Sequence, residues 1–561
     1  MSDENKTRRP YAPRMSPHQT YEEINSYVVF WGLFFSVLFA LAVGYLCLKI
    51  GQTVDAFAPV SVLAMGMAVL FHRRNAFPET VHIQAIASAG TNIIGGAMFI
   101  LPALYILNIE DVSFLEMAIP IVLGGVLGVF LATVFRRYFC EEMDGVYPFP
   151  SGSAAAEVLE SDEGSKAHIM LVSGAVALVY DFVLNSIGWW QELLTTTTFH
   201  WGQVLADKYK LVFSLDNDAA LLGIGMLAMS GIIGLLSMSG VVVRVVKRAV
   251  ADLFSKGASS SGMLLRTQQD LPMTQIVFVS LLMTILFAVF FHVMCAESLT
   301  QTVIAFVLVM LFALMLSVVG ISSIAFTGNE PVSGMTIFMI IVSAVVMGGA
   351  GMAGKTGIIA ILMMAAFLCA TLAVSSNFMS ELKVAYITGA TPKKMQQWQL
   401  VSIVLAGVVS VGVVFLMHHA YGFTGEGALA APQANAMAAI VKPMMDGGDA
   451  PWPLYMAGAF FAVLLWMMKI PPLAFALGSY LPMGINTPVL VGGLISYFVS
   501  HSSDDAKVNA KRLSEGNTVA SGFVAGGAIG SLISAVLHIA GIVAYFVLCI
   551  FLYAMAKRAV K

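Results

Sequence analysis

The chain has 561 residues, including 29 Lys or Arg and 32 Asp or Glu, which gives a formal net charge of −3 at pH 7. Only 11% of the residues are charged and 58% are hydrophobic, whereas a soluble domain has about 25% charged residues. These values exclude a soluble globular enzyme, a disordered protein and a fibrous protein. The sequence also has no basic domain of the kind that binds nucleic acid. The apolar residues form continuous blocks instead of the alternation typical of a transmembrane β-barrel. We therefore expect an all-α polytopic membrane protein in a lipid bilayer.

The first 26 residues are polar and charged, with no short apolar stretch followed by a cleavage site. We expect residues 1–26 to form a cytoplasmic N-terminal tail rather than a cleaved signal peptide. Beyond them, each membrane crossing requires about 20 mostly apolar residues. The apolar blocks predict about 14 crossings, near residues 27–48, 54–71, 81–107, 116–136, 168–190, 218–243, 274–295, 301–320, 335–352, 357–377, 400–420, 453–469, 518–535 and 538–556.

Two further apolar segments are interrupted by proline and glycine, Tyr147–Leu159 (YPFPSGSAAAEVL) and Leu473–Val499. We predict broken or re-entrant helices here, at the centre of the protein, which brings the total to about 14–16 segments. Paired Gly/Pro-interrupted segments in two halves are typical of the binding site of a secondary transporter. Such backbone is tolerated at membrane depth only where protein or a wet cavity surrounds it.

Basic residues predict the orientation, because Lys and Arg in short loops stay on the cytoplasmic side. Clusters that include Arg136 and Arg244 fall on one side if both termini are cytoplasmic and the broken segments turn back. A single full crossing by Tyr147–Leu159 would instead place the Arg244–Arg266 loop outside. The loop at Gly422–Pro451 is poor in basic residues and is expected outside.

Short sequence matches indicate an internal repeat. Leu38–Leu41 (LFAL) recurs at Leu311–Leu314, and Pro59–Ser61 recurs at Pro331–Ser333, both about 270 residues later. Such matches also arise by chance in an apolar sequence, but these two share nearly the same offset, about half the chain. We therefore predict two duplicated transmembrane halves, which comprise residues 27–270 and 271–561.

The segment Tyr147–Leu159 contains the first candidate site residues. After two prolines, Ser151 is expected to cap a helix of small residues that includes Gly152. The free N–H groups and the positive end of the helix dipole would favour an anionic group. Glu157, less than two turns into this helix, would bind an amine or carry a proton. The alternative is a cytoplasmic cap with a solvated Glu157.

Asn329 and Glu330 lie between two long uncharged stretches of the sequence. The adjacent Pro331 removes a backbone donor, and the nearby Gly328 and Gly334 loosen the helix. Because charged residues between apolar stretches are costly and mark functional sites, Glu330 is a candidate for proton or amine binding. An ordinary loop between two crossings is the alternative.

Four more candidates lie on predicted helices of the first half. His82 and Gln84 belong to a glycine-rich helix, for which close helix packing is the alternative to a role in the transport pathway. Asp181 and Asn185 are four residues apart in the predicted crossing 168–190 and would share one helix face. A buried acid at this position would suit proton coupling, and a structural polar contact is the alternative.

The remaining candidates lie in the second half. Asn377 and Glu381 come at the end of the predicted crossing 357–377, next to Lys383. Because Lys383 follows the positive-inside rule, the alternative is an interfacial pair of Glu381 with Lys383. Asn486 lies in the second broken segment.

Several motifs are missing from the sequence. It has no GxxxxGK[ST] phosphate loop, no HExxH motif and no CxxC pair among its five cysteines. We therefore expect no cofactor, metal centre or catalytic residues, and no enzyme. Without an ATP site, a proton or sodium gradient is the natural energy source.

Four stretches of the sequence resemble one known family. Tyr147–Leu159 resembles the FPSGxAxAEVL signature of the oligopeptide transporter (OPT) family, and Met379–Gln399 resembles its SDLKxGY stretch. Leu473–Tyr497 resembles a late YLP…P…GGLIxY segment, and Pro78–Gly90 resembles an early QTxASAG-like segment. These stretches occur in the family's order, and the chain is most similar to the prokaryotic branch, which is related to plant yellow-stripe-like metal-chelate carriers.

This resemblance implies a carrier of about 16 helical segments, built from duplicated halves. It also implies proton-coupled uptake of small peptides or peptide-like compounds. The early segment departs from the family pattern, because Ile86 stands where Thr is usual. The residues that match the first two motifs are Pro150, Ser151, Gly152, Glu157, Glu381 (where the family has Asp), Lys383 and Tyr386.

We therefore expect a secondary active transporter of the bacterial inner membrane, with both termini cytoplasmic. It would import small oligopeptides or peptide-like compounds, most simply by proton symport. Acidic side chains would bind the substrate amine, and helix N-termini would bind its carboxylate. Uptake of metal chelates is the alternative; an intramembrane enzyme and a passive channel are less favoured, and a homo-oligomer is compatible with the sequence.

Overall fold

The computed structural model describes most of residues 13–160, 265–446 and 483–505, short pieces between 172 and 216, and scattered positions in 458–468 and 508–523. The chain divides into two compact units. The first unit comprises residues 1–167 and 228–481, and the second comprises 168–227 and 482–561. Five predicted crossings lie wholly or largely outside the described residues, at 168–190, 218–243, 453–469, 518–535 and 538–556.

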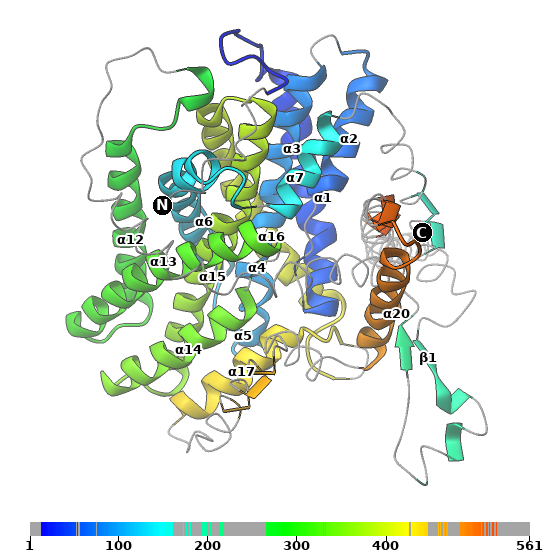
Figure 1. The fold of residues 1–561 in the computed structure, drawn as a ribbon. Coiled ribbons are helices and arrows are strands. Elements are labelled where there is room, and N and C mark those ends of the chain that lie inside the picture. The colour runs from blue at the N-terminus through cyan, green and yellow to red at the C-terminus, as the bar shows by residue number, and fades with distance from the viewer. Residues whose placement is uncertain are drawn as a thin grey trace, which may run out of the picture. The chain divides into compact units, whose positions relative to one another are not determined.

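The described part of the first unit is helical (Figure 1). Its elements are α1 (Ser26–Ile50), α2 (Phe57–Leu70), α3 (Ala76–Asn92), α4 (Ile94–Met98), α5 (Pro102–Ile106), α6 (Phe114–Arg136), a π-helix (Arg137–Glu142), α7 (Pro150–Glu160), a 3₁₀ turn (Arg266–Gln268), α12 (Met273–Met294), α13 (Leu299–Thr327), α14 (Val332–Gly349), α15 (Gly354–Thr388), α16 (Pro392–Ala420) and α17 (Pro432–Met445).

The described part of the second unit is smaller. It contains the strands β1 (Leu193–Thr195) and β2 (Ser214–Asp216), a 3₁₀ turn (Thr196–Thr198) and the helix α20 (Met483–Ser500). The strands pair antiparallel, with Leu194 opposite Leu215. The helix α20 packs against β2 within this unit.

Seven helical segments among the described residues are long and apolar enough to cross a membrane, which confirms the expected all-α polytopic membrane fold. Several predicted crossings agree with a helix to within a few residues, such as 116–136 with α6. Others are wrong at their boundaries: the predicted crossing 357–377 belongs to a helix that continues to Thr388. The seven segments are Ser26–Lys49, Ala76–Ile106, Phe114–Glu142, Arg266–Met294, Leu299–Ala325, Gly354–Thr388 and Pro392–Ala420.

The helix α15 is the central element of the first unit. In its most apolar stretch 94% of the residues are buried, against 22% for the segment that contains α12. Its closest neighbour is α6, where a Cβ added to Gly124 would lie 2.2 Å from the carbonyl oxygen of Phe367. Thr371 also donates from Oγ1 to the carbonyl of Gly124 at 3.0 Å. Small residues at such contacts let two membrane helices approach closely.

The helix α17 lies in a segment that we expected to be an external loop, Gly422–Pro451. It packs against α5, α14 and α15 and buries Val441 and Met445 completely or nearly so. Its 14 residues are too few for a crossing. The hydropathy of the segment does not separate such a short packed helix from a loop.

Residues 13–25, which we call the N-terminal segment, are fixed across one end of the first unit. The Met15 N–H donates to the carbonyl of Thr388 at 3.0 Å, and the Met15 side chain is buried among residues of α7 and α15. Glu23 is completely buried, ion-paired with Arg266 and, at 3.0 Å, with Lys394. The segment therefore connects α15, the α15–α16 turn and the entry to α12.

The pKa of Glu23 is lowered from its ordinary value. Burial by itself raises the pKa, but the nearby His82 and hydrogen bonds from Lys394 and Thr391 outweigh that effect. A lowered pKa means that the ionised Glu23 stabilises the fold above the ordinary pKa of Glu. This stabilisation is lost as the pH falls through the lowered pKa of the folded state.

We predict that Glu23→Gln lowers the stability of the purified protein at pH 7 by about 3 kcal/mol, because Arg266 and Lys394 lose their buried counter-charge. The measurement is the unfolding temperature in detergent between pH 7 and pH 3. The difference from wild type should shrink at the acid end, where Glu23 is protonated as well. Glu22→Gln, at an exposed neighbouring position, is the control; equal unfolding temperatures for all three proteins at pH 7 would contradict the role of Glu23.

Candidate functional site

Glu330 lies at a break between two helices, where α13 ends and α14 has not begun. Gly328 ends α13 with a φ of 73°, a left-handed conformation that glycine adopts without strain. The Glu330 carboxylate accepts two hydrogen bonds from neutral donors. Thr53 Oγ1 donates to Oε1 at 2.7 Å, and Asn377 Nδ2 donates to Oε2 at 2.7 Å. Three distant parts of the chain therefore meet at this carboxylate.

A second acid, Glu381, lies one turn further along α15. It is completely buried, and Gln84 Nε2 of α3 donates to its Oε1 at 2.9 Å. Because Asn377 and Glu381 are four residues apart, they share one face of α15. The sequence-predicted residues Glu330, Asn377, Glu381 and Gln84 thus form two neighbouring amide–carboxylate pairs.

The start of α7 packs against the same region. The Phe149 N–H donates to the carbonyl of Ala325 at 2.8 Å, and Ser151 Oγ donates to the carbonyl of Gly328 at 3.1 Å. Gly152 lies so close to α15 that an added Cβ would be 2.9 Å from the carbonyl oxygen of Ser380. The first broken segment therefore donates hydrogen bonds to the carbonyl groups at the end of α13.

The predicted role of Ser151 as a helix cap is wrong. The helix α7 begins at Pro150, so Ser151 lies inside its first turn, and its hydroxyl binds the neighbouring helix end instead. Proline is well suited to the first helical position, because its missing N–H would have no helical partner there. Later residues of α7, such as Leu159, lie in one apolar cluster with Ala385 and Ala390 of the α15 end. The later part of α7 thus packs beside the end of α15.

Lys383 binds the segment that precedes α7 in the chain. Its side chain is buried, with an ion pair of 2.5 Å to Asp144 and a hydrogen bond of 3.2 Å to the carbonyl of Cys140. The Lys383 ammonium also lies 4.7 Å from the centre of the Tyr386 ring. Glu381 and Lys383 both lie inside α15 and have the described partners Gln84 and Asp144, respectively.

The other predicted residues do not join this cluster in the described structure. His82 is buried on α3, with Nδ1 3.0 Å from the carbonyl of Pro78, and it interacts electrostatically with Glu23 instead. Across the described residues, no three His, Cys, Asp or Glu side chains lie close enough to hold a metal ion. The remaining predictions fall on positions or side chains outside the described residues, namely Glu157, Asp181, Asn185, Asn329 and Asn486.

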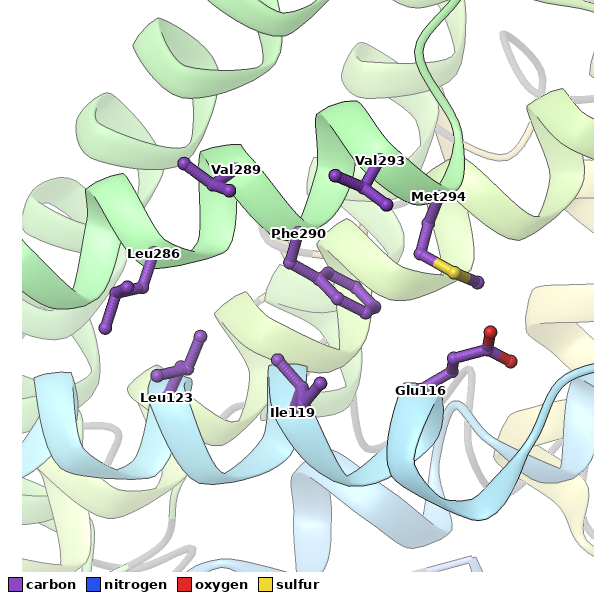
Figure 2. Close-up of a pocket in the computed structure, with 8 residues that line it drawn as sticks. All are labelled: Glu116, Ile119, Leu123, Leu286, Val289, Phe290, Val293 and Met294. Atoms are coloured by element: carbon purple, nitrogen blue, oxygen red, sulfur yellow. The ribbon is translucent and has the colours of Figure 1, made fainter.

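A groove of about 470 Å³ lies between α6 and α12 (Figure 2), and no residue of the two amide–carboxylate pairs lines it. Glu116 lies at one end of it, and its carboxylate completes a helix cap with Ser113. Every other lining residue is apolar, and Val289 and Val293 are exposed. This composition suits lipid chains better than a polar substrate.

Comparison with known proteins identifies the family. The family model described as "OPT oligopeptide transporter protein" matches residues 23–246 and 214–538, which is most of the chain. The chain belongs to the OPT family. This confirms the resemblance carried by the sequence motifs, and it makes the protein a membrane transporter rather than an enzyme.

Two relatives illustrate the range of the OPT family. A Haemophilus influenzae protein named "Putative oligopeptide transporter" is 22% identical over 589 aligned positions, which cover 88% of this chain and 92% of the relative. An Arabidopsis thaliana protein named "Probable metal-nicotianamine transporter YSL5" is 31% identical over 186 positions. This second alignment covers 30% of this chain and 25% of the relative.

The sequence pattern does not indicate Thr53, which binds Glu330 in this candidate site of the OPT family protein. Thr53 follows the first long apolar stretch and carries no charge, so nothing in its local pattern distinguishes it from a loop threonine. Its role depends on a hydrogen bond to a residue 277 positions later in the chain.

We predict that Gly152→Ala impairs transport, because the new methyl group would be forced against the Ser380 carbonyl of the central helix. Overpacking of this kind costs about 1–3 kcal/mol, enough to reduce the competent state about tenfold. Initial uptake rates in proteoliposomes, normalised to reconstituted protein, measure the effect. Gly412→Ala in α16 is the matched control, since its added Cβ meets no atom within 4 Å; equal rates for both variants would contradict the proposed close contact.

Proposed function

We propose that this OPT family protein is a secondary active transporter that imports small oligopeptides or peptide-like compounds by proton symport. The observation that carries this proposal is the position of Glu330 at a helix break, held by Thr53 and Asn377. Asn377 lies about 16 Å along α15 from Thr388. With the membrane surface taken at Thr388, at the basic end of the first unit, this distance is about half the thickness of a bilayer's hydrocarbon core, a depth typical of a transporter site.

Glu330 is suited to carry the coupled proton. The described hydrogen bonds to it come from the neutral groups of Thr53 and Asn377. Protonation of the carboxylate changes the net charge of the cluster by one. Ionisable residues at membrane depth are rare because they are costly, and in pumps and transporters they often relay protons. Protonation of Glu330 changes its affinity for the charged groups of a peptide, which links proton binding to substrate binding.

The start of α7 is suited to the other end of a peptide. Helix N-termini favour carboxylates through their dipole and their free N–H groups. Because α7 begins beside Gly328, one substrate could contact Glu330 with its amine and α7 with its carboxylate. Glu157, Asp181 and Asn486 remain candidates for further substrate contacts.

The basic end of the first unit favours a cytoplasmic N-terminus. Arg266 and Lys394 bind the N-terminal segment there, and Arg136 pairs with Asp270 beside them. By the positive-inside rule this end is cytoplasmic. We propose a bacterial inner-membrane location with both termini on that side.

Uptake of metal chelates is the second candidate function. It is favoured by the aligned region shared with the Arabidopsis protein named as a metal-nicotianamine transporter. Competition of labelled peptide uptake by unlabelled peptides, free chelators and metal-loaded chelators separates the two. Competition by loaded chelates alone would favour this second candidate.

We predict that Glu330→Gln abolishes proton-driven accumulation, because the amide cannot take up the coupled proton. The measurement is peptide uptake by proteoliposomes with and without an imposed pH gradient. Glu116→Gln, in the apolar groove between α6 and α12, is the control and should accumulate substrate like wild type. If Glu330→Gln retains gradient-dependent accumulation, Glu330 does not carry the proton.

A further inference from the structure

Two buried amides next to acids each have one unused oxygen. Asn377 and Gln84 give their N–H groups to Glu330 and Glu381, respectively. No donor within the described part of the chain reaches Asn377 Oδ1 or Gln84 Oε1, although both atoms are buried. A buried acceptor without a partner is unfavourable, and such atoms are rare in folded proteins.

The hydrogen-bonding capacity of the two groups explains this arrangement. An ionised carboxylate only accepts hydrogen bonds, whereas a protonated carboxyl group can also donate one. A side-chain amide does both, because its nitrogen donates and its oxygen accepts, and the two atoms point in different directions from the amide carbon. The observed orientation, with nitrogen toward the acid, therefore fits the ionised acids and leaves the amide oxygen unused.

We propose that Asn377 is a positioning residue that reports the protonation state of Glu330 by turning its amide, and that Gln84 does the same for Glu381. When the acid is protonated, a half-turn of the amide brings its oxygen to the new O–H donor. The previously unused oxygen is then satisfied, and the amide N–H groups point to the opposite side. This inference rests on the proposed proton coupling of the site.

Because of the arrangement along α15, rotation of one amide also affects the hydrogen bonds that the site offers to a substrate. Asn377 and Glu381 share one helix face, so the two amides act on neighbouring turns of the central helix. Turning Asn377 moves its N–H groups away from Glu330 and offers them to whatever occupies the other side, such as a substrate carbonyl. Proton binding would thus change which hydrogen bonds the site offers to a peptide, in addition to its charge.

The other titratable groups near the pairs are few in the described structure. The thiols of Cys47 on α1 and Cys369 on α15 lie within electrostatic range of Glu330. Near Glu381, Lys383 on the same helix is ion-paired with Asp144, and His82 on α3 interacts with Glu23. The charged Lys383 and Glu23 thus have partners of their own, and the two amides are in direct contact with the acids.

The test is the pH dependence of uptake by the full-length protein carrying Asn377→Leu. Leucine has a similar size but cannot stabilise the ionised acid, so Glu330 should take up its proton at higher pH. We expect the pH of half-maximal uptake to rise by about one unit. Gln84→Leu should shift it in the same direction. Asn377→Thr, whose hydroxyl can donate or accept, should restore the midpoint toward wild type and also serves if the leucine variant does not fold.

Matched controls are available for both variants. Asn92 on α3 and Gln399 on α16 are buried amides whose nitrogen atoms have no described hydrogen-bond partner. Asn92→Leu and Gln399→Leu should leave the pH midpoint unchanged. Infrared difference spectra between high and low pH give a second readout, in which the carboxyl band of wild type should shift in Asn377→Leu and not in Asn92→Leu.

The outcomes separate this inference from the proposed function. If Glu330→Gln retains gradient-dependent accumulation, the proton coupling itself is wrong. If Glu330→Gln loses accumulation while Asn377→Leu keeps the wild-type pH midpoint and infrared band, the proposed rotation of the Asn377 amide is wrong and the proton coupling stands. A general loss of uptake at every pH, with an unchanged midpoint, would mean that Asn377 is merely structural.

Discussion

The architecture of the site depends on the rule that broken backbone at membrane depth must find its hydrogen bonds inside the protein. Here the first broken segment donates to the end of α13. The carbonyls of Ala325 and Gly328, at the end of α13, accept from Phe149 and Ser151, at the start of α7. These hydrogen bonds explain why a proline-rich turn and a glycine-ended helix lie side by side. It also places the Glu330 carboxylate beside the start of a helix, where opposite ends of a zwitterionic substrate would be recognised.

The central helix α15 gives this site its precision. It is buried along most of its length and contacts α6 at glycine positions, where one added methyl group would meet a backbone carbonyl. A helix held this tightly cannot shift easily, because packed interiors have little free volume. The backbone positions of Asn377 and Glu381 are therefore fixed. Changes in hydrogen bonding are expected in their side chains and in the broken segments around them.

Charge is distributed in two different ways along the first unit. At the end that carries the N-terminal segment, buried acids are paired with cations, as Glu23 is with Arg266 and Lys394. At the site, the described donors to Glu330 and Glu381 are neutral, namely two amides and a hydroxyl. A carboxylate between cations is held ionised, which suits a structural role. A carboxylate contacted by neutral donors can change its protonation state at lower cost, which suits a role in coupling.

The sequence by itself determined the class of the protein, its helical character and its family, and it indicated Glu330, Asn377 and Glu381 as candidate site residues. These conclusions follow from local properties: charge density, apolar length, proline and glycine positions, and motif spacing. Only the tertiary structure decided that Thr53 binds Glu330, that Gln84 binds Glu381, that α15 continues past Glu381, and that α17 is a packed helix. The physical reason is that a hydrogen-bond partner is chosen by proximity in space. Partners separated by 277 and 297 residues leave no trace in the composition or periodicity of either segment.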